Sequence, residues 1–421
     1  MEFSNKIWDL VSEAEVALKE TFDEIDRVSF SNTQKVMNAF AEHRVSDGMF
    51  GSTSGYGYDD KGREVLDEIW ADVFGCEAAL VRHSIVSGTH ALTIGLFGIL
   101  RPGDIMLSVA GKPYDTLEEV IGIVGEPGNG SLKDFGVEYK QIELTDDGKF
   151  DFDAVGRELK VNAQKIKMVF IQRSKGYLNR RTLTVDEIGE MARFVKSISP
   201  ETFVVVDNCY GEFVEEKEPV AVGADLCIGS LIKNPGGGMA ETGGYFAGTR
   251  RAVELVSYRL TSPGTGGEVG ATIGQNKSMY KGLFYAPHTT AQALKTGYLA
   301  AYIFEKMGYN AAPRYTEKRS DIIQTVITGD PEILCAFCRG IQAGSPVDAF
   351  VCPEPWDMPG YTDKVIMAAG AFTSGSSIEL SADGPLREPY TAFLQGGLTY
   401  ESGRIGILSA AAEVIKLKMG N

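Results

Sequence analysis

The chain has 421 residues, of which 43% are hydrophobic and 23% are charged, and its formal net charge is -16 at pH 7. This acidity argues against a nucleic-acid-binding protein, because the neutralisation of phosphates requires clustered lysine and arginine. No apolar run approaches the roughly 20 residues that span a bilayer, and the first residues lack the apolar stretch of a secretory signal, so we expect a cytoplasmic protein without membrane partners.

The first fifty residues are predicted to be helical. Apolar residues recur at helical spacing from Ile7 to Val28, and a second helical run extends from Thr33 to His43. We treat residues 1–50 as an N-terminal helical segment. An amphipathic helix from residue 63 to 74 then leads into a strand at 78–83.

Residues 51–290 alternate between short apolar strands and helices. Short strands that are apolar throughout and separated by helices predict a mainly parallel sheet covered on both faces. We therefore predict a large, doubly wound α/β domain that binds its ligands at the carboxyl ends of the strands. The strands are expected at 105–108, 168–172, 202–207, 225–230 and 244–247, and the helices at 90–100, 116–124 and 185–197.

Residues 291–421 show a different pattern, which predicts a smaller α+β domain. The six cysteines of the chain are scattered, and only Cys335 and Cys338 form a CxxC pair. Because a zinc site would need a second pair nearby, we expect these thiols to pack on a helix and predict no metal. The predicted elements are helices at 289–306 and 409–418 and strands at 349–352 and 365–369.

A lysine directly after a predicted strand is the first candidate for chemistry. The strand ends at Ser230, Lys233 follows three residues later, and a glycine-rich turn begins at Gly236. In a pocket at a strand end, a lysine amine can lose its charge and attack an aldehyde, and the glycines let the backbone approach a ligand closely. An ordinary loop lysine is the alternative when this segment is considered alone.

An aspartate at a strand end is the second candidate. The strand at 202–207 delivers Asp207, whose carboxylate can pair with a protonated pyridine nitrogen and keep the ring cationic as an electron sink. A helix cap or turn aspartate is the alternative. Asp225 is a rival, but it opens its strand and should lie at the opposite end of the sheet.

A candidate phosphate site precedes an apolar helix. Ser87, Gly88 and Thr89 provide a helix N-terminus, whose backbone N–H groups and dipole attract anions, and two hydroxyls. The hydroxyl of Ser230 can reach the same phosphate from the other side. Together with the strand-end aspartate, these residues predict pyridoxal 5'-phosphate (PLP), held as a Schiff base on Lys233.

These motifs resemble a known family. The order Ser-Gly-Thr, Asp and Ser-x-x-Lys resembles the aspartate-aminotransferase-like superfamily, the PLP enzymes of fold type I. More closely, the chain is similar to the branch related to cystathionine β-lyase and methionine γ-lyase that is often labelled aluminium-resistance protein. The matching motifs cover nearly the whole chain: Gly55 to Asp60, Ser87 to Ala91, Gly111 to Thr116, Asp207 to Glu212, Gly229 to Gly238, Ala286 to His288, Gly375 to Pro385 and Gln395 to Tyr400.

The resemblance implies roles for the matching residues. The catalytic residues would be Lys233, which carries the cofactor, Asp207, which pairs with the pyridinium, and Tyr114, which stacks on the ring. Tyr56 and Tyr58 resemble a loop that reaches the phosphate from a neighbouring subunit, which implies a homo-oligomer with shared active sites, commonly a dimer of dimers. The phosphate would be held by Ser87, Gly88, Thr89 and Ser230.

A substrate carboxylate usually meets an arginine, because the planar guanidinium suits bidentate pairing. Arg387 is the first choice, with Arg173 and Arg404 as rivals, and surface salt bridges are the alternative for all three. His90 and His288 lie within matched motifs, but a structural role is expected for both.

The resemblance implies carbon–sulfur bond cleavage in a sulfur amino acid of the cystathionine, cysteine or methionine type. Lys233 would remove the α-proton, for which its pKa must be lowered, and a thiol would leave from the β- or γ-carbon. The same proton transfer serves transamination, so a PLP-dependent aminotransferase is an alternative. A catalytically silent fold type I binding protein is the third hypothesis.

Overall fold

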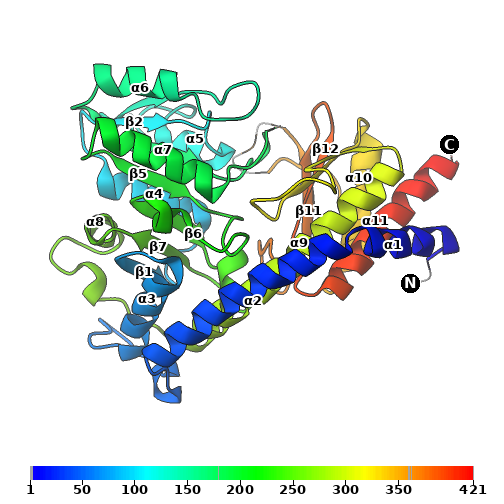
Figure 1. Ribbon diagram of the computed structural model, residues 1–421, viewed down its shortest axis with the longest axis horizontal. Coiled ribbons are helices and arrows are strands. Elements are labelled where there is room, and N and C mark those ends of the chain that lie inside the picture. Colours follow the sequence, from blue (N-terminus) through cyan, green and yellow to red (C-terminus); the bar gives the residue numbers. More distant parts are fainter. Residues whose placement is uncertain (1–2, 179, 359–360, 362, 421) are drawn as a thin grey trace.

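The computed structural model describes residues 3–178, 180–358, 361 and 363–420. Figure 1 shows two sheets, each with its own helices, connected by the long helix α9 (Asn276–Lys306). The larger sheet has the strand order β1-β7-β6-β5-β4-β2-β3, and the smaller one has the order β10-β11-β12-β9-β8. Within the described ranges, no helix is both long and apolar enough to cross a membrane.

The larger sheet is mainly parallel, as predicted. Strands β3, β2, β4, β5 and β6 run parallel to one another, and only β7 is antiparallel to its neighbours β6 and β1. The edge strand β3 was not predicted, because its sequence Glu-Tyr-Lys-Gln is polar. The strands are β1 (Ala78–Arg82), β2 (Ile105–Ser108), β3 (Glu138–Gln141), β4 (Ile166–Gln172), β5 (Phe203–Asp207), β6 (Leu226–Ser230) and β7 (Gly244–Gly248).

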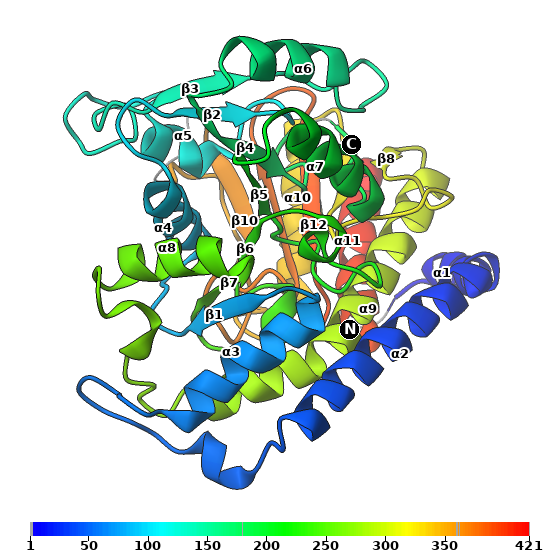
Figure 2. The same cartoon turned by 60° about the vertical axis from the view of Figure 1, so that its left-hand side comes forward.

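Hydrophobic cores lie on both faces of this sheet. Alternate residues of a strand point to opposite faces: Val204 and Val206 of β5 join one core, whereas Val205 joins the other. Helices α4, α5 and α8 cover one face and α3, α6 and α7 the other, which makes the sheet doubly wound (Figure 2). The helices are α3 (Lys61–Phe74), α4 (Gly88–Ile99), α5 (Asp115–Ile121), α6 (Phe152–Val161), α7 (Val185–Ile198) and α8 (Arg250–Leu260).

The smaller sheet is antiparallel throughout. The strand predicted at 365–369 is confirmed as β10, but the prediction of a strand at 349–352 is wrong: this segment is irregular, and Phe350 is 89% exposed. An apolar run alone therefore did not specify a strand where no core covers it. The strands are β8 (Asn310–Ala312), β9 (Gln324–Ile327), β10 (Val365–Ala368), β11 (Ser381–Pro385) and β12 (Thr391–Gln395), with helices α10 (Pro331–Ala343) and α11 (Tyr400–Gly420).

Helix α9 begins at Asn276 rather than at the predicted Thr289, and it continues through Pro287. Its first half contributes Leu283 to a core of the large sheet, and its second half contributes Leu299 to the core of the small sheet. Since residue 290 lies inside this continuous helix, the division of the chain into domains at that position stays a prediction.

The N-terminal segment forms two helices, α1 (Asn5–Ala17) and α2 (Lys19–Glu42), and α2 runs alongside α9 (Figure 1). The break between them lies at Leu18, not between Val28 and Thr33 as the periodicity suggested. Short 3-10 helices complete the described elements: η1 (Asp47–Phe50), η2 (Pro219–Val222), η3 (Asn234–Gly236) and η4 (Gly266–Glu268).

Candidate active site

The carboxyl ends of the parallel strands open into a cavity of about 270 Å³. Five of the predicted site residues line it: Gly88, Thr89, Tyr114, Asp207 and Lys233. Asp207 is the last residue of β5, Lys233 follows the end of β6, and Gly88 and Thr89 open helix α4. Parallel strands bring their carboxyl ends to one edge, which explains why residues distant in sequence meet here.

Lys233 is half-buried at the start of the glycine-rich turn. Its Nζ atom lies 4.0 Å from the centroid of the Tyr210 ring. Burial alone would lower the pKa of this amine, but the neighbouring Cys209, Tyr210 and Asp207 outweigh burial, so the pKa is raised. This direction differs from the lowered pKa expected for a lysine base, because Cys209, Tyr210 and Asp207 together favour the ammonium form.

Asp207 is buried, and its Oδ1 atom accepts a hydrogen bond of 3.1 Å from the backbone N–H of Cys209. Burial raises the pKa of this carboxyl group, while Lys233 opposes the rise. The rival Asp225 lies where its strand opens, away from the cavity. Its side chain accepts a hydrogen bond from the backbone N–H of Val204 and forms an ion pair of 2.8 Å with Lys196.

The N-terminus of α4 approaches Lys233 closely. A Cβ atom added to Gly88 would lie 3.8 Å from the Nζ of Lys233 and 3.6 Å from the Cβ of Ser230. Ser87 caps the helix by accepting a hydrogen bond from the N–H of His90, and Thr89 pairs with Thr116 through their hydroxyls.

The hydroxyl of Ser230 indicates whether an anionic group would fit between these residues. Its Oγ atom is buried and has no hydrogen-bond partner within the described part of the chain. A buried hydroxyl without a partner is costly, and the first N–H groups of a helix lack partners within the helix. This combination of donors fits a phosphate group between α4 and the end of β6.

Tyr114 precedes α5 and lines the cavity. Its hydroxyl forms a hydrogen bond of 2.8 Å with the hydroxyl of Tyr361. Tyr177 lies against both rings and donates a hydrogen bond of 2.8 Å to the Oδ2 atom of Asp383. The position of Tyr114 is compatible with stacking on a cofactor ring, and its role stays a prediction.

The predicted arginines do not line the cavity. Arg173 is fully buried, where it forms an ion pair of 2.7 Å with Glu215 and donates to the side chain of Asn208. These contacts occupy its guanidinium within the protein, and its role toward a substrate carboxylate stays a prediction. Arg387 is partly exposed and pairs with Asp363 at 3.0 Å, so a substrate role for it stays a prediction.

Arg404 is bound to Glu15 at 2.7 Å, next to the N-terminal helices. Tyr56 and Tyr58 are 73% and 57% exposed, and their rings stack on each other with centroids 5.5 Å apart. Neither tyrosine lines the cavity of its own chain. His90 accepts a hydrogen bond from the backbone N–H of Val86 through its Nδ1 atom, which agrees with a structural role.

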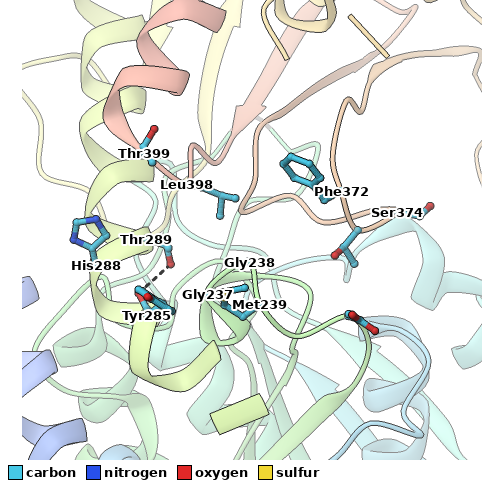
Figure 3. Close-up of a pocket in the computed structure, with 12 residues that line it drawn as sticks. Gly237, Gly238, Met239, Tyr285, His288, Thr289, Phe372, Ser374, Leu398 and Thr399 are labelled. Atoms are coloured by element: carbon cyan, nitrogen blue, oxygen red, sulfur yellow. Dashed lines mark hydrogen bonds between the residues drawn. The ribbon is translucent and has the colours of Figure 1, made fainter. Parts of the chain in front are cut away.

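A second, more open cavity of about 800 Å³ lies beside the glycine turn that follows Lys233 (Figure 3). His288, Tyr285 and Thr289 of α9 face it, together with Phe372. None of the catalytic candidates lines this cavity. Among the residues described, no group of three or more histidine, cysteine or acidic side chains is placed to hold a metal ion.

Several cavity residues were not identified as site residues from the sequence. Gln172 ends β4 beside Asp207, a strand-end position that was a usable signal. Tyr210, Tyr361 and Asp383 were not identified because they come from turns and from the small sheet, whose strands were mostly not predicted.

This arrangement defines a class of protein. A doubly wound, mainly parallel sheet with a lysine and an aspartate at its strand ends is the fold of PLP enzymes of fold type I, as expected from the sequence. The solved structure of the PLP-dependent protein YhfS from Escherichia coli has a TM-score of 0.61 and 15% identity, and the match covers 92% of this chain and 97% of that one. At this identity, the likeness concerns the fold alone.

The model of the methionine gamma-lyase family matches residues 7–415, so the chain belongs to this family of carbon–sulfur lyases. The resemblance found in the sequence is thereby confirmed. The Bacillus subtilis (strain 168) protein YnbB is 52% identical over 407 residues, which cover 97% of this chain and 96% of YnbB. A crystal structure described as a carbon-sulfur lyase involved in aluminum resistance, from Clostridium novyi NT, has a TM-score of 0.94 and 52% identity, with 97% and 96% of the two chains covered.

Proposed function

We propose that this protein is a PLP-dependent carbon–sulfur lyase that acts on a sulfur amino acid. The observation that carries the proposal is the cavity in which Lys233 and Asp207 meet beneath the N-terminus of α4. Membership of the methionine gamma-lyase family supports the same reaction class.

The described residues fit the cofactor by their chemistry. Lys233 would hold the aldehyde of PLP, Asp207 would pair with its ring nitrogen, and the Tyr114 ring would lie against its face. Ser230 and the N-terminus of α4 would hold the phosphate, which would give the buried Ser230 hydroxyl its missing partner. When bound, PLP supplies an electron sink for negative charge at the α-carbon of the substrate.

The side chains of this cavity would handle the protons of the elimination. The amine of Lys233 would accept the α-proton of the substrate. The linked hydroxyls of Tyr114 and Tyr361 offer a donor for the departing sulfur. Water then completes the reaction, so that the products are a thiol, a 2-oxo acid and ammonia.

Spectroscopy of the purified protein with PLP tests the cofactor and its anchor. We expect a yellow protein that is bleached by borohydride, and a Lys233→Ala variant that lacks the lysine-linked species. A protein that stays colourless after incubation with PLP would overturn the proposal.

Product assays then test the reaction. We expect a thiol and a 2-oxo acid from L-cystathionine, L-cysteine or L-methionine: pyruvate indicates β-elimination from cysteine, and 2-oxobutyrate indicates γ-elimination from methionine. Conversion of the bound cofactor to its amine form, with turnover only when a second oxo acid is added, would identify an aminotransferase instead.

We also propose a homo-oligomer, commonly a dimer of dimers in this family, with active sites shared between subunits. The exposed, stacked rings of Tyr56 and Tyr58 support this proposal, since they lie outside the cavity of their own chain. The loop that carries them is fixed rather than free: Arg63 donates hydrogen bonds to the carbonyls of Gly57 and Gly270.

A further inference from the structure

A carboxylate lies on the wall of the cavity that the small sheet provides. Asp383 belongs to β11 and lines the cavity together with Gln395 of β12 and Tyr361. Its Oδ2 atom accepts the hydrogen bond from Tyr177, whereas its Oδ1 atom is buried without a hydrogen-bond partner in the described chain. This oxygen is therefore able to accept a hydrogen bond from a ligand.

Among the residues that the structure describes, no neighbouring cation balances the charge of Asp383. Burial raises the pKa of this carboxyl group to about 6, while hydrogen bonding by the neutral side chains of Tyr177 and Gln395 and by the backbone opposes the rise. The group is thus mostly ionised at neutral pH. Lys233 is the single cation among the described residues that line the cavity, and it is held by the opposite wall near Asp207.

A partly buried carboxylate without a cationic partner is stabilised when a ligand brings a positive charge. The α-amino group of a substrate is not that charge, because it must reach Lys233 on the large-sheet wall. The remaining candidate is the group at the far end of the sulfur substituent, which would point toward the small sheet.

We propose that Asp383 selects substrates whose sulfur substituent ends in an ammonium group, such as S-(2-aminoethyl)-L-cysteine. This inference rests on the proposed lyase function and names its substrate class. The β-carbon–sulfur bond would break, the α-proton would leave the substrate, and the sulfur would take up a proton and depart as 2-aminoethanethiol. Water converts the remaining three-carbon fragment to pyruvate and ammonia, so no oxidant or reductant is consumed.

A pair of near-isosteric substrates tests the selection. S-(2-aminoethyl)-L-cysteine and S-propyl-L-cysteine differ only by ammonium against methyl at the far end. We expect the wild-type kcat/KM ratio to favour the amine by about tenfold or more, the size of a charge-assisted hydrogen bond. In Asp383→Asn, the ratio should fall to near one. Cleavage of both substrates at equal kcat/KM by the wild type would overturn the inference.

Tyr177→Phe is the matched control, because it removes the hydrogen bond to Asp383 and keeps the carboxylate. Because loss of the Tyr177 hydrogen bond raises the pKa of Asp383 further, the variants are compared at increasing pH. If Asp383 contacts the substrate, Tyr177→Phe regains the preference for the amine once the carboxylate is ionised. If Asp383 serves only to orient Tyr177, both variants lose the preference to the same extent, and the inference is wrong. Circular dichroism of each variant checks that the fold is retained.

Binding provides a readout that does not depend on turnover. L-Lysine and L-2-aminoheptanoic acid replace the sulfur of the two substrates by methylene and cannot be cleaved at that position. Calorimetry with the PLP-loaded protein should show tighter binding of L-lysine, lost in Asp383→Asn. Preferential binding of L-lysine without cleavage of either cysteine derivative would sustain the inference and overturn the lyase proposal. Cleavage of the cysteine derivatives without any preference for the amine in binding or turnover would sustain the lyase proposal and overturn the inference on Asp383.

Discussion

Glu212 shows how a single buried group couples protonation to stability. It lies fully buried behind the active-site strands, where its Oε1 atom accepts a hydrogen bond of 2.8 Å from Tyr245. Burial, with a further contribution from the neighbouring Glu218, raises the pKa of Glu212 from 4.5 to about 8. The folded protein therefore favours the protonated acid. The stability that this preference contributes is complete below pH 4.5 and is lost as the pH rises through about 8.

We expect Glu212→Gln, which mimics the protonated acid, to flatten this pH dependence. In the wild type, Glu212 should lower the free energy of unfolding by up to about 1.4 kcal/mol per pH unit between its unfolded and folded pKa values. Urea unfolding at a series of pH values measures the slope. Glu201→Gln, at an exposed position, is the control and should leave the slope as it is. Equal slopes in wild type and Glu212→Gln would refute the prediction.

Asp207 gives a prediction about cofactor binding. Asp207→Asn removes the negative charge proposed to pair with the ring nitrogen, so we expect weaker PLP binding and a loss of kcat/KM of about 100-fold or more. PLP titration followed by visible absorbance, together with the thiol assay, measures both effects.

Asp225→Asn is the matched control, because its carboxylate binds Lys196 and the backbone of Val204 away from the cavity. It should lower stability and leave PLP affinity near the wild-type value. A larger loss of PLP affinity in Asp225→Asn than in Asp207→Asn would show that the ring-nitrogen role does not belong to Asp207.

At the scale of the elements, Asp60 ties three segments together. Its Oδ1 atom caps α3 by accepting from the N–H of Arg63 and also accepts from Asn276 at the start of α9, and its Oδ2 atom accepts from Thr272 and Thr53. Burial opposes ionisation, but these hydrogen bonds outweigh it and lower the pKa of Asp60. The resulting stability is present above the ordinary pKa of aspartate and is lost as the pH falls below it.

We expect Asp60→Ala to lower the free energy of unfolding by about 2–4 kcal/mol, because it removes a helix cap and leaves several donors unsatisfied. Asp151→Ala, which removes a cap of α6 with one hydrogen bond to the N–H of Ala154, should cost about 1 kcal/mol. Thermal unfolding of the two variants compares them. A cost for Asp60→Ala no greater than that for Asp151→Ala would contradict this network.

The elements also show what the sequence could predict. Strands β5 and β6 are short and mostly apolar; β5 ends at Asp207, and Lys233 follows the end of β6, so both the strands and the edge at which they meet were predictable. The reversed direction of β7 was not, because periodicity carries no information on strand direction. The start of α9 was placed too late, since Pro287 is typical of a first helical turn, whereas tertiary packing carries the helix through it.

At the scale of the whole molecule, the cavity is made by two sheets. The large sheet provides Lys233 and Asp207, and the small sheet provides Asp383. Only the part of the cavity that the large sheet provides could be predicted from sequence patterns. The antiparallel strands of the small sheet are short and mix polar with apolar residues. Helix α9 contributes to the cores of both sheets and thereby fixes one wall of the cavity against the other.

Shared active sites would make activity a property of the assembly, which mixed oligomers can test. We expect Lys233→Ala to be inactive and a Tyr56→Phe/Tyr58→Phe double variant to be strongly impaired. In a mixed dimer, one site combines Lys233 of the tyrosine variant with Tyr56 and Tyr58 of the Lys233→Ala chain and is intact. The other site lacks both the lysine and the tyrosines. Random pairing after equal co-expression should therefore restore about a quarter of the wild-type activity.

The mixing ratio separates this arrangement from independent sites. Activity that follows the product of the two subunit fractions, together with an oligomer in sedimentation velocity, agrees with tyrosines that act across the interface. Activity that equals the sum of the two parents at every ratio would mean that Tyr56 and Tyr58 serve their own chain or no active site. Because both rings are exposed and lie outside the cavity of their own chain, the first outcome is the one expected.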